Sequence, residues 1–324
     1  METIRVGGRR YSDPDVLSLI KATGSLVDPR SSVLTQARKR LQTLNKFGDI
    51  PKDPIERLTI LASICGIAEV LPMNIEQRKG DKRDALLVAN VSGGRSIIYN
   101  PTAPRTRVAF SIAHEIIHTF FPNSINGARF RNVCASESRE ANELERLCDL
   151  GASELLMPLS DFQRVATTTG YTFSAVSTLM EIFGSSFEAT AFRLASAHPG
   201  VAVAGLLRYR LRLEEQRRKK AVAQTMLFSL SATGGAGEEA EPKYRRQSLH
   251  LSEACSDAYT IRWNKSFPVE SVVYSAALNG DIQVGHEVSP NQVGTKGRLE
   301  AVRAPYQRDE ADPVFGDILF FWRI

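Results

Sequence analysis

The stretch FSIAHEIIHTFFP, residues 110–122, decides how this sequence is interpreted. Positions 114–118 read HEIIH and fit the pattern HExxH. On a helix, residues four positions apart lie on one face. An apolar stripe at helical spacing accompanies them, made of Ile112, Ile116 and Phe120. The stretch therefore predicts a helix with two imidazoles on one face.

Two imidazoles in this arrangement can hold one zinc ion, and the glutamate between them can act as a general base on water. The alternative is a core helix whose two histidines are simply hydrogen-bonded. The chain has five histidines in 324 residues, so this pattern is unexpected by chance. We therefore expect one Zn²⁺ per chain on His114 and His118, with Glu115 as the catalytic base.

A catalytic zinc site usually has three protein ligands. The metzincin pattern is excluded, because Phe121 and Ser124 stand where it needs Gly and His. A second helix is predicted over residues 136–158 by its apolar spacing, with Pro158 as its end. That helix carries the candidate carboxylates Glu137, Glu140, Glu143, Glu145 and Glu154.

Spacing distinguishes these five glutamates. A histidine that binds zinc usually donates its other N–H to an outer carboxylate. Of the five, only Glu145 is followed four residues later by an acid, Asp149. We therefore expect Glu145 as the third ligand and Asp149 as the residue that orients a zinc histidine. Glu143 remains the alternative ligand, and a solvated helix face is the simpler interpretation for Glu137 and Glu140.

The segments RVAFSIAHEIIH and ELERLCDLGASELLMP together resemble the ImmA/IrrE family of zinc-dependent metallo-endopeptidases. In that family the second helix reads ExxA(N/D)xFAxxLLMP, which places its Glu on Glu145 and its Asn/Asp on Asp149. Two positions depart from the pattern: Cys148 stands where Ala is usual, and Gly151 where Phe is usual. The resemblance covers roughly residues 31–213. It implies an endopeptidase with a narrow substrate range that cleaves a transcriptional repressor, such as a helix-turn-helix protein controlling a mobile element or a stress response.

Strand-like runs precede the first helix. Residues 84–91 and 95–100 predict a β-hairpin, and the resemblance implies that a small sheet borders the zinc cleft. We expect an exposed edge at Ile97, Tyr99 and Asn100 to bind substrate as an added strand. Tyr99 is also a candidate for stabilising the oxyanion. The alternative for all three residues is ordinary sheet packing.

Two later segments carry a hypothesis of nucleic-acid contact. Residues 173–195 predict two helices about a short turn, which is a helix-turn-helix-like segment. Because Arg193 is almost the only side chain there suited to reading bases, a structural role is favoured over DNA binding. Residues 205–213 predict a strand with one basic face, formed by Arg208, Arg210 and Arg212. That face is either solvated or a weak contact with DNA phosphates or an acidic partner.

The expected architecture is α+β: a zincin-like HExxH helical domain with a small β-sheet, followed by a β-rich C-terminal domain. We divide the chain into an N-terminal extension (1–30), a metallopeptidase domain (31–200), a basic strand or connector (201–228), a linker (229–247) and the β-rich domain (248–324). In the last, residues 271–278 and 281–288 flank Asn279-Gly280, which predicts a hairpin.

Bulk composition fits a cytoplasmic protein. Hydrophobic residues make up 43% and charged residues 24%, with a net charge of +5. No run approaches the roughly 20 apolar residues of a membrane span, and the first residues do not predict a signal peptide. The four cysteines form no CxxC pair. Two other functions stay open: a catalytically silent regulator that binds DNA, and a zinc-bound module that binds a repressor or antitoxin.

Overall fold

The structure is a computed structural model of the chain. It describes all residues except 1, 25–26, 76–83, 91–92, 123–138, 229–240, 256–260, 263–264, 289–293, 307–311 and 313. The chain forms two compact units. The first consists of Met1–Arg164 with Leu179–Ser186, and the second of Val165–Thr178 with Phe187–Ile324.

Three helices of the first unit begin with the same dipeptide, Asp-Pro. They are α1 (Pro14–Thr23), α2 (Pro29–Leu44) and α3 (Pro54–Ile64). In each, the aspartate accepts backbone N–H groups of the first turn and proline occupies the first helical position, where it loses no hydrogen bond. Residues 1–30, which the sequence left unassigned, contain α1 and the hairpin β1 (Ile4–Val6) and β2 (Arg9–Tyr11).

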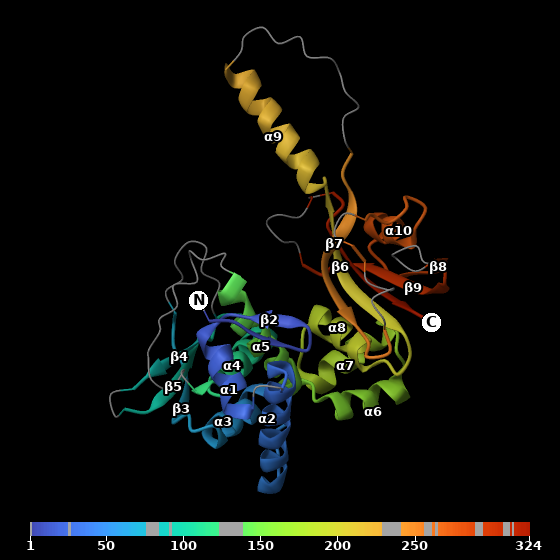
Figure 1. The fold of residues 1–324 in the computed structure, drawn as a ribbon. Coiled ribbons are helices and arrows are strands. Elements are labelled where there is room, and N and C mark those ends of the chain that lie inside the picture. The colour runs from blue at the N-terminus through green and yellow to red at the C-terminus, as the bar shows by residue number, and fades with distance from the viewer. Residues whose placement is uncertain are drawn as a thin grey trace. The chain divides into compact units, whose positions relative to one another are not determined.

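A three-stranded sheet in this unit has the order β3-β5-β4. Its strands are β3 (Glu69–Pro72), β4 (Ala85–Ala89) and β5 (Arg95–Tyr99). The predicted hairpin is confirmed, since β4 and β5 pair antiparallel with Leu87 opposite Ile97. The strand β3 adds parallel to the other side of β5. The outer strands of the sheet are thus β3 and β4 (Figure 1).

The two helices predicted to carry the site are α4 (Arg105–His118) and α5 (Arg139–Leu156). Residues 136–138 of the expected second helix lie outside the described residues. Gly151 permits the close approach of α5, because a Cβ there would lie 2.7 Å from Cδ1 of Ile117 and 2.8 Å from Cγ1 of Val33. A phenylalanine at this position would not fit against these neighbours.

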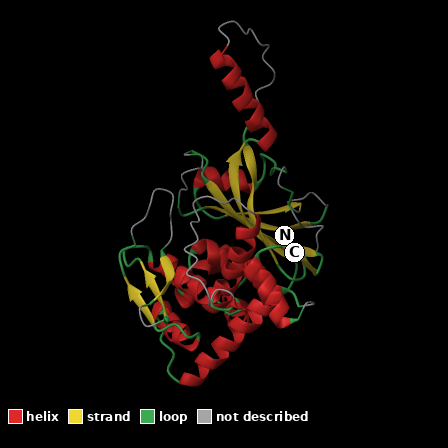
Figure 2. Ribbon diagram, turned by 60° about the vertical axis from the view of Figure 1, so that its left-hand side comes forward, coloured by secondary structure: helices red, strands yellow, loops and turns green. Residues whose placement is uncertain are grey.

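The second unit is built on a five-stranded antiparallel sheet with the order β7-β6-β10-β9-β8. Figure 2 shows its strands in yellow as a twisted fan. They are β6 (Ala202–Arg210), β7 (Lys243–Leu251), β8 (Gln283–Val288), β9 (Lys296–Arg303) and β10 (Asp317–Arg323). Large apolar side chains of this sheet are fully buried, among them Tyr244, Phe320 and Trp322.

The elements of this unit cross the expected domain boundaries. The strand β6, assigned to a connector, lies inside the sheet between β7 and β10. Residues 229–240 of the expected linker lie outside the described residues, but β7 begins at Lys243, within that segment. Between them, Leu213–Phe228 form the helix α9. The expected division of the chain stays a prediction, and β6 is better grouped with the C-terminal strands.

One predicted strand of this unit is a helix. Residues Val272–Asn279 form α10, which Ser271 caps by accepting the N–H of Val273. Gly280 ends the helix in the left-handed conformation, with φ of 78°. The predicted Asn-Gly hairpin is therefore wrong. A glycine with positive φ suits both a hairpin turn and a helix end, and the capping serine selects the second.

Two helices contribute residues to both units, α6 (Leu159–Thr169) and α7 (Phe173–Phe183), and α8 (Phe187–Ala197) follows a short turn. These bounds agree with the predicted helix-turn-helix-like segment. Arg193 on α8 is only 8% exposed, so its side chain is not presented for reading bases. Within the described part of the chain, no helix combines the length and apolar character needed to cross a bilayer.

Candidate metal centre

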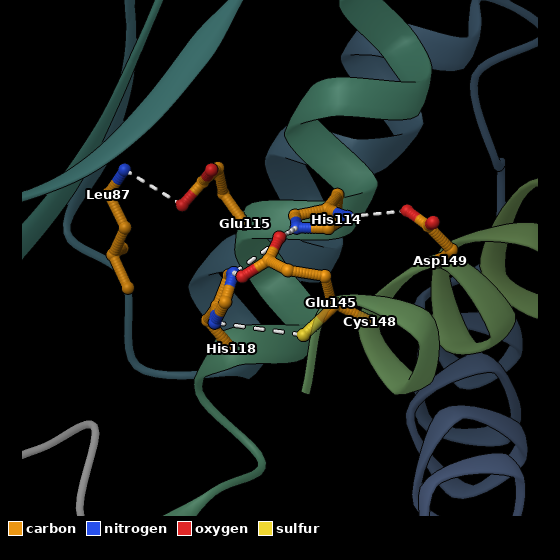
Figure 3. A network of polar contacts seen from close by, with 7 residues as sticks. All are labelled: Leu87, His114, Glu115, His118, Glu145, Cys148 and Asp149. Carbon is orange, nitrogen blue, oxygen red and sulfur yellow. Dashed lines mark hydrogen bonds and ion pairs between the residues drawn. The ribbon is translucent and has the colours of Figure 1, made fainter. Parts of the chain in front are cut away.

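The helix α4 brings the two histidines together, as their spacing predicts. The ring centroids of His114 and His118 are 4.9 Å apart, and their Nε2 atoms are separated by 3.2 Å. Both side chains are mostly buried, with 15% and 18% of their surface exposed. Figure 3 shows the two rings on one face of the helix.

The helix α5 places a carboxylate against both rings. Oε2 of Glu145 lies 3.1 Å from Nε2 of His114, and Oε1 lies 4.0 Å from Nε2 of His118. One turn later, Oδ1 of Asp149 lies 3.0 Å from Nδ1 of His114. The two carboxylates thus face the two different nitrogens of one imidazole (Figure 3).

This arrangement strongly favours a positive charge on His114. Burial of the ring opposes its protonation, but the hydrogen bonds to Asp149 and Glu145 and the charge of Glu115 outweigh burial. Together they raise the pKa of His114 to about 10. Without a metal, a proton therefore occupies the nitrogen that faces Glu145.

The donor atoms fit a zinc ion in kind and in spacing. Zinc takes imidazole nitrogen and carboxylate oxygen at about 2.0–2.2 Å, so tetrahedral ligand atoms lie about 3.3 Å apart. The separations among Nε2 of His114, Nε2 of His118 and the Glu145 oxygens are 3.1, 3.2 and 4.0 Å. The two shorter separations match the tetrahedral spacing, and the 4.0 Å separation joins His118 to the other carboxylate oxygen, Oε1.

A second set of possible ligands shares both histidines and adds Cys148, with ligand atoms within 4.8 Å of one another. We favour the set with Glu145 on geometry. Sγ of Cys148 lies 3.6 Å from Nδ1 of His118, whereas it is Nε2 of that ring that faces His114. Nε2 of His118 also faces Glu145, so an ion on this nitrogen lies on the opposite side of the ring from the sulfur. In the sequence, Cys148 stood out only as a departure from a family pattern. Its position three residues after Glu145, on the same helix face, was a signal that it could lie near the histidines.

The glutamate between the two histidines points to the small sheet. Oε2 of Glu115 accepts the backbone N–H of Leu87 on β4 at 3.0 Å. The start of β4 is tied to α4 by Arg107, whose guanidinium is 2.6 Å from the carboxylate of Asp84. The carboxylate expected to act as a base therefore lies between the histidines and an outer strand (Figure 3).

The structure separates Glu143 and Glu154 from this centre. Glu143 accepts the backbone N–H groups of Ser12 at 2.8 Å and Asp13 at 3.1 Å. Glu154 is buried and pairs with Arg38 at 2.9 Å. Glu137 lies outside the described residues, and the side chain of Glu140 is not described. Of the described candidates, only Glu145 meets the histidines.

The residues expected to form a substrate-binding edge do not lie at an edge of the sheet. Ile97 and Tyr99 belong to β5, the central strand, so their backbone groups pair on both sides. Ile97 is fully buried, and the Asn100 side chain accepts the N–H of Thr102 in the following turn. The three residues therefore do not form an edge. The hairpin prediction lacked β3, whose parallel pairing covers β5.

Comparisons with known proteins agree with this picture. Residues 68–195 match the family model Peptidase_M78, described as the IrrE N-terminal-like domain. Among solved structures, a Mycobacterium tuberculosis transcriptional regulator is similar with a TM-score of 0.53 and 14% identity, over 95% of this chain and 80% of that one. At that identity the similarity concerns the fold alone. No curated protein matches the sequence. The matched region contains the whole of α4 and α5 with all the residues of the centre, and by this match residues 68–195 belong to the family of IrrE N-terminal-like domains.

Proposed function

We propose that this chain is a zinc-dependent endopeptidase, with His114, His118 and Glu145 holding one zinc ion and Glu115 acting as general base. The observation that carries the proposal is the approach of one carboxylate and two Nε2 atoms to within 3.1–4.0 Å, with Asp149 on the far nitrogen of His114. A zinc ion held there supplies Lewis-acid polarisation of a peptide carbonyl and acidifies water. The substrate class suggested by the family resemblance is a transcriptional repressor.

The chain's own residues account for the proton transfers. The carboxylate of Glu115, held by the N–H of Leu87 on the side of α4 that faces β4, is the group that would take a proton from the attacking water. The same carboxylate then returns a proton to the leaving amine, as a base that becomes an acid does in peptide hydrolysis. An extended substrate would pair with β4, the outer strand beside Glu115, rather than with β5.

The test separates metal binding from chemistry. Glu115→Gln keeps the size of the side chain and removes the base, so the variant should bind one zinc and lose at least 10²–10⁴-fold in cleavage, roughly the contribution of general acid–base catalysis. Zinc content is measured on purified protein. Cleavage is measured by profiling new protein N-termini in cells that express wild type or variant.

We expect new N-termini from one or a few proteins with wild type and none with the variant. Equal profiles with both proteins, at full zinc content, would support the catalytically silent regulator instead. A wild type that binds no zinc would refute the metal centre itself.

A second candidate function, weak contact with DNA, is favoured by the position of charge. Residues 208–246 contain ten Lys and Arg and five Glu, which gives +5, equal to the net charge of the whole chain. Arg217, Arg218 and Lys219 on α9 are exposed. The predicted basic strand is less available, because Arg208 is buried and pairs with Asp317 at 3.1 Å.

Binding of a labelled duplex by the full chain tests this function. The triple change Arg217→Gln, Arg218→Gln and Lys219→Gln should weaken binding. It should also reduce the slope of log binding constant against log salt concentration by about 1 for each DNA phosphate that the protein no longer neutralises. The matched control removes three exposed arginines of the β1–β2 hairpin, Arg5, Arg9 and Arg10. Equal effects of the two triple changes would mean that binding depends on overall charge and not on α9. Absence of binding by wild type would exclude the contact.

A further inference from the structure

The second histidine of the centre also has a partner on its far nitrogen. A histidine that binds a metal is fixed by the hydrogen bond that its other ring nitrogen makes, which sets the tautomer and the ring orientation. Asp149 fills this place for His114, at 3.0 Å from Nδ1. For His118, the group near Nδ1 is the thiol of Cys148, with Sγ at 3.6 Å (Figure 3).

The tautomer of His118 follows from the position of its two nitrogens. Nε2 faces the Nε2 of His114 at 3.2 Å and is the atom directed at the proposed ion. With the lone pair on Nε2, the proton of a neutral ring is on Nδ1. Nδ1–H then donates to the sulfur of Cys148, which is an acceptor of modest strength.

The surroundings of Cys148 keep this contact dry. The residue is fully buried, on the face of α5 that packs against α4. Gly151, one turn further, allows that packing through its contact with Ile117. A water molecule is therefore poorly placed to replace the sulfur. An alanine at position 148, which the family pattern would have, would leave the Nδ1–H of His118 without this acceptor.

We infer that Cys148 is a positioning residue that holds His118 through Nδ1–H, so that two consecutive residues of α5, Cys148 and Asp149, each orient one histidine of the metal centre. The inference rests on the proposed zinc site. In this assignment, Cys148 accepts a hydrogen bond from Nδ1 of His118 and is not a ligand of the ion. Because neutral sulfur is a weaker acceptor than a carboxylate, its loss should cost about tenfold in metal affinity, the lower end of the 10–100-fold range for such partners.

Metal affinity and spectroscopy test the assignment without relying on activity. Zinc affinity is measured by competition with a chelator for wild type, Cys148→Ala, Cys148→Ser and Asp149→Ala. We expect a loss of about tenfold for Cys148→Ala, a larger loss for Asp149→Ala, and partial recovery in Cys148→Ser, since a hydroxyl also accepts a hydrogen bond. Cys255→Ala is the control, because it removes a thiol from the second unit.

Cobalt substitution distinguishes an orienting thiol from a ligand. The Co²⁺-loaded wild type should show no thiolate-to-cobalt charge-transfer band, and the Nδ1–H proton resonance of His118 should change or vanish in Cys148→Ala. A charge-transfer band that disappears in Cys148→Ala would make the cysteine a ligand and overturn the inference. Unchanged affinity and an unchanged His118 resonance in Cys148→Ala would also overturn it.

The two levels of the proposal fail separately. Absence of zinc binding by wild type refutes the proposed function. Zinc binding that is lost in Glu145→Ala but unaffected in Cys148→Ala leaves the metal centre intact and refutes only the role of the cysteine. If Cys148→Ala is unstable, Cys148→Val provides the same comparison, because it fills most of the space of the thiol and also removes the acceptor.

Discussion

The proton on His114 provides a direct test of how the centre is assembled. In the metal-free protein, burial of the ring opposes its charge, while Asp149 and Glu145 raise the pKa to about 10. A histidine in an unfolded chain has a pKa near 6.5. A difference of about 3.5 units corresponds to about 5 kcal/mol. Since the Asp149 and Glu145 side chains are 56% and 37% exposed, solvent screens them, and about 2–3 kcal/mol is the better expectation for two charge-assisted hydrogen bonds.

The sign of the pH effect follows from the raised pKa. The folded, metal-free state holds the proton more tightly than the unfolded state, so this contribution to stability is fully present below about pH 6.5 and is lost as the pH rises towards 10. Zinc must displace the same proton. We therefore expect zinc binding at neutral pH to release a proton from His114, and its affinity to increase with pH in that range.

Nuclear magnetic resonance of the metal-free protein measures this proton. With five histidines in the chain, each ring can be assigned by substitution. We expect His114 to titrate above about pH 8, the value that roughly 2–3 kcal/mol implies. Asp149→Asn should lower that midpoint by at least about one unit, because one of the two anionic acceptors is lost. His250 is an internal reference whose pKa is shifted in the opposite direction, since burial lowers it to about 4.

A His114 midpoint at or below 6.5 would refute the reasoning, because it would mean that the two carboxylates do not hold the ring in solution. A raised midpoint that Asp149→Asn does not lower would show that Asp149 is not the orienting group. Calorimetry in buffers with different ionisation enthalpies provides the second measurement. Zinc binding near pH 7 without net proton release would contradict a protonated His114.

Three further outcomes are expected. Glu145→Ala should lower zinc affinity by more than about 100-fold, beyond the range for an outer partner, whereas Glu143→Gln should leave it unchanged; the reverse result in a chelator titration would exchange the two roles. Gly151→Ala should lower the free energy of unfolding by about 1–3 kcal/mol through overpacking between α4 and α5, and an unchanged melting temperature would show that these helices separate without cost. A chain ending at Gly237 should be insoluble, since it keeps β6 but loses its neighbours β7 and β10; a soluble, folded fragment would show that β6 does not need this sheet.

The residues that α4 and α5 bring together at the candidate metal centre could be predicted to share helix faces from the sequence, because their spacing is local. Two spacings within helices, His114 to His118 and Glu145 to Asp149, determine which side chains share a face, and Pro158 marks the end of the second helix. Helical periodicity does not depend on the rest of the chain. The contact of Cys148 with His118 could not be predicted from the sequence, because the pairing of α4 with α5 is tertiary and nothing in the sequence shows which ring a cysteine meets.

Two of the errors share one physical cause, which is pairing between segments distant in the sequence. The edge at Ile97 was wrong because β3 reaches β5 from a segment that precedes the hairpin. The strand β6 was separated from its sheet because β10, its partner, begins more than a hundred residues later, at Asp317. The hairpin at Gly280 was wrong for a local reason, since Asn-Gly fits two structures and the Ser271 cap selects between them.

The division of the chain into two units also limits how recombination can exchange parts of this protein. The first unit takes residues from two segments, Met1–Arg164 and Leu179–Ser186, so the polypeptide enters the second unit, returns and enters it again. A single recombination joint in the gene, wherever it falls, therefore cannot exchange one unit intact for that of another protein. Exchange of a whole unit would need several joints at once. We expect the metal centre and the C-terminal sheet to have diversified together, by substitution and by loop insertion, rather than by shuffling.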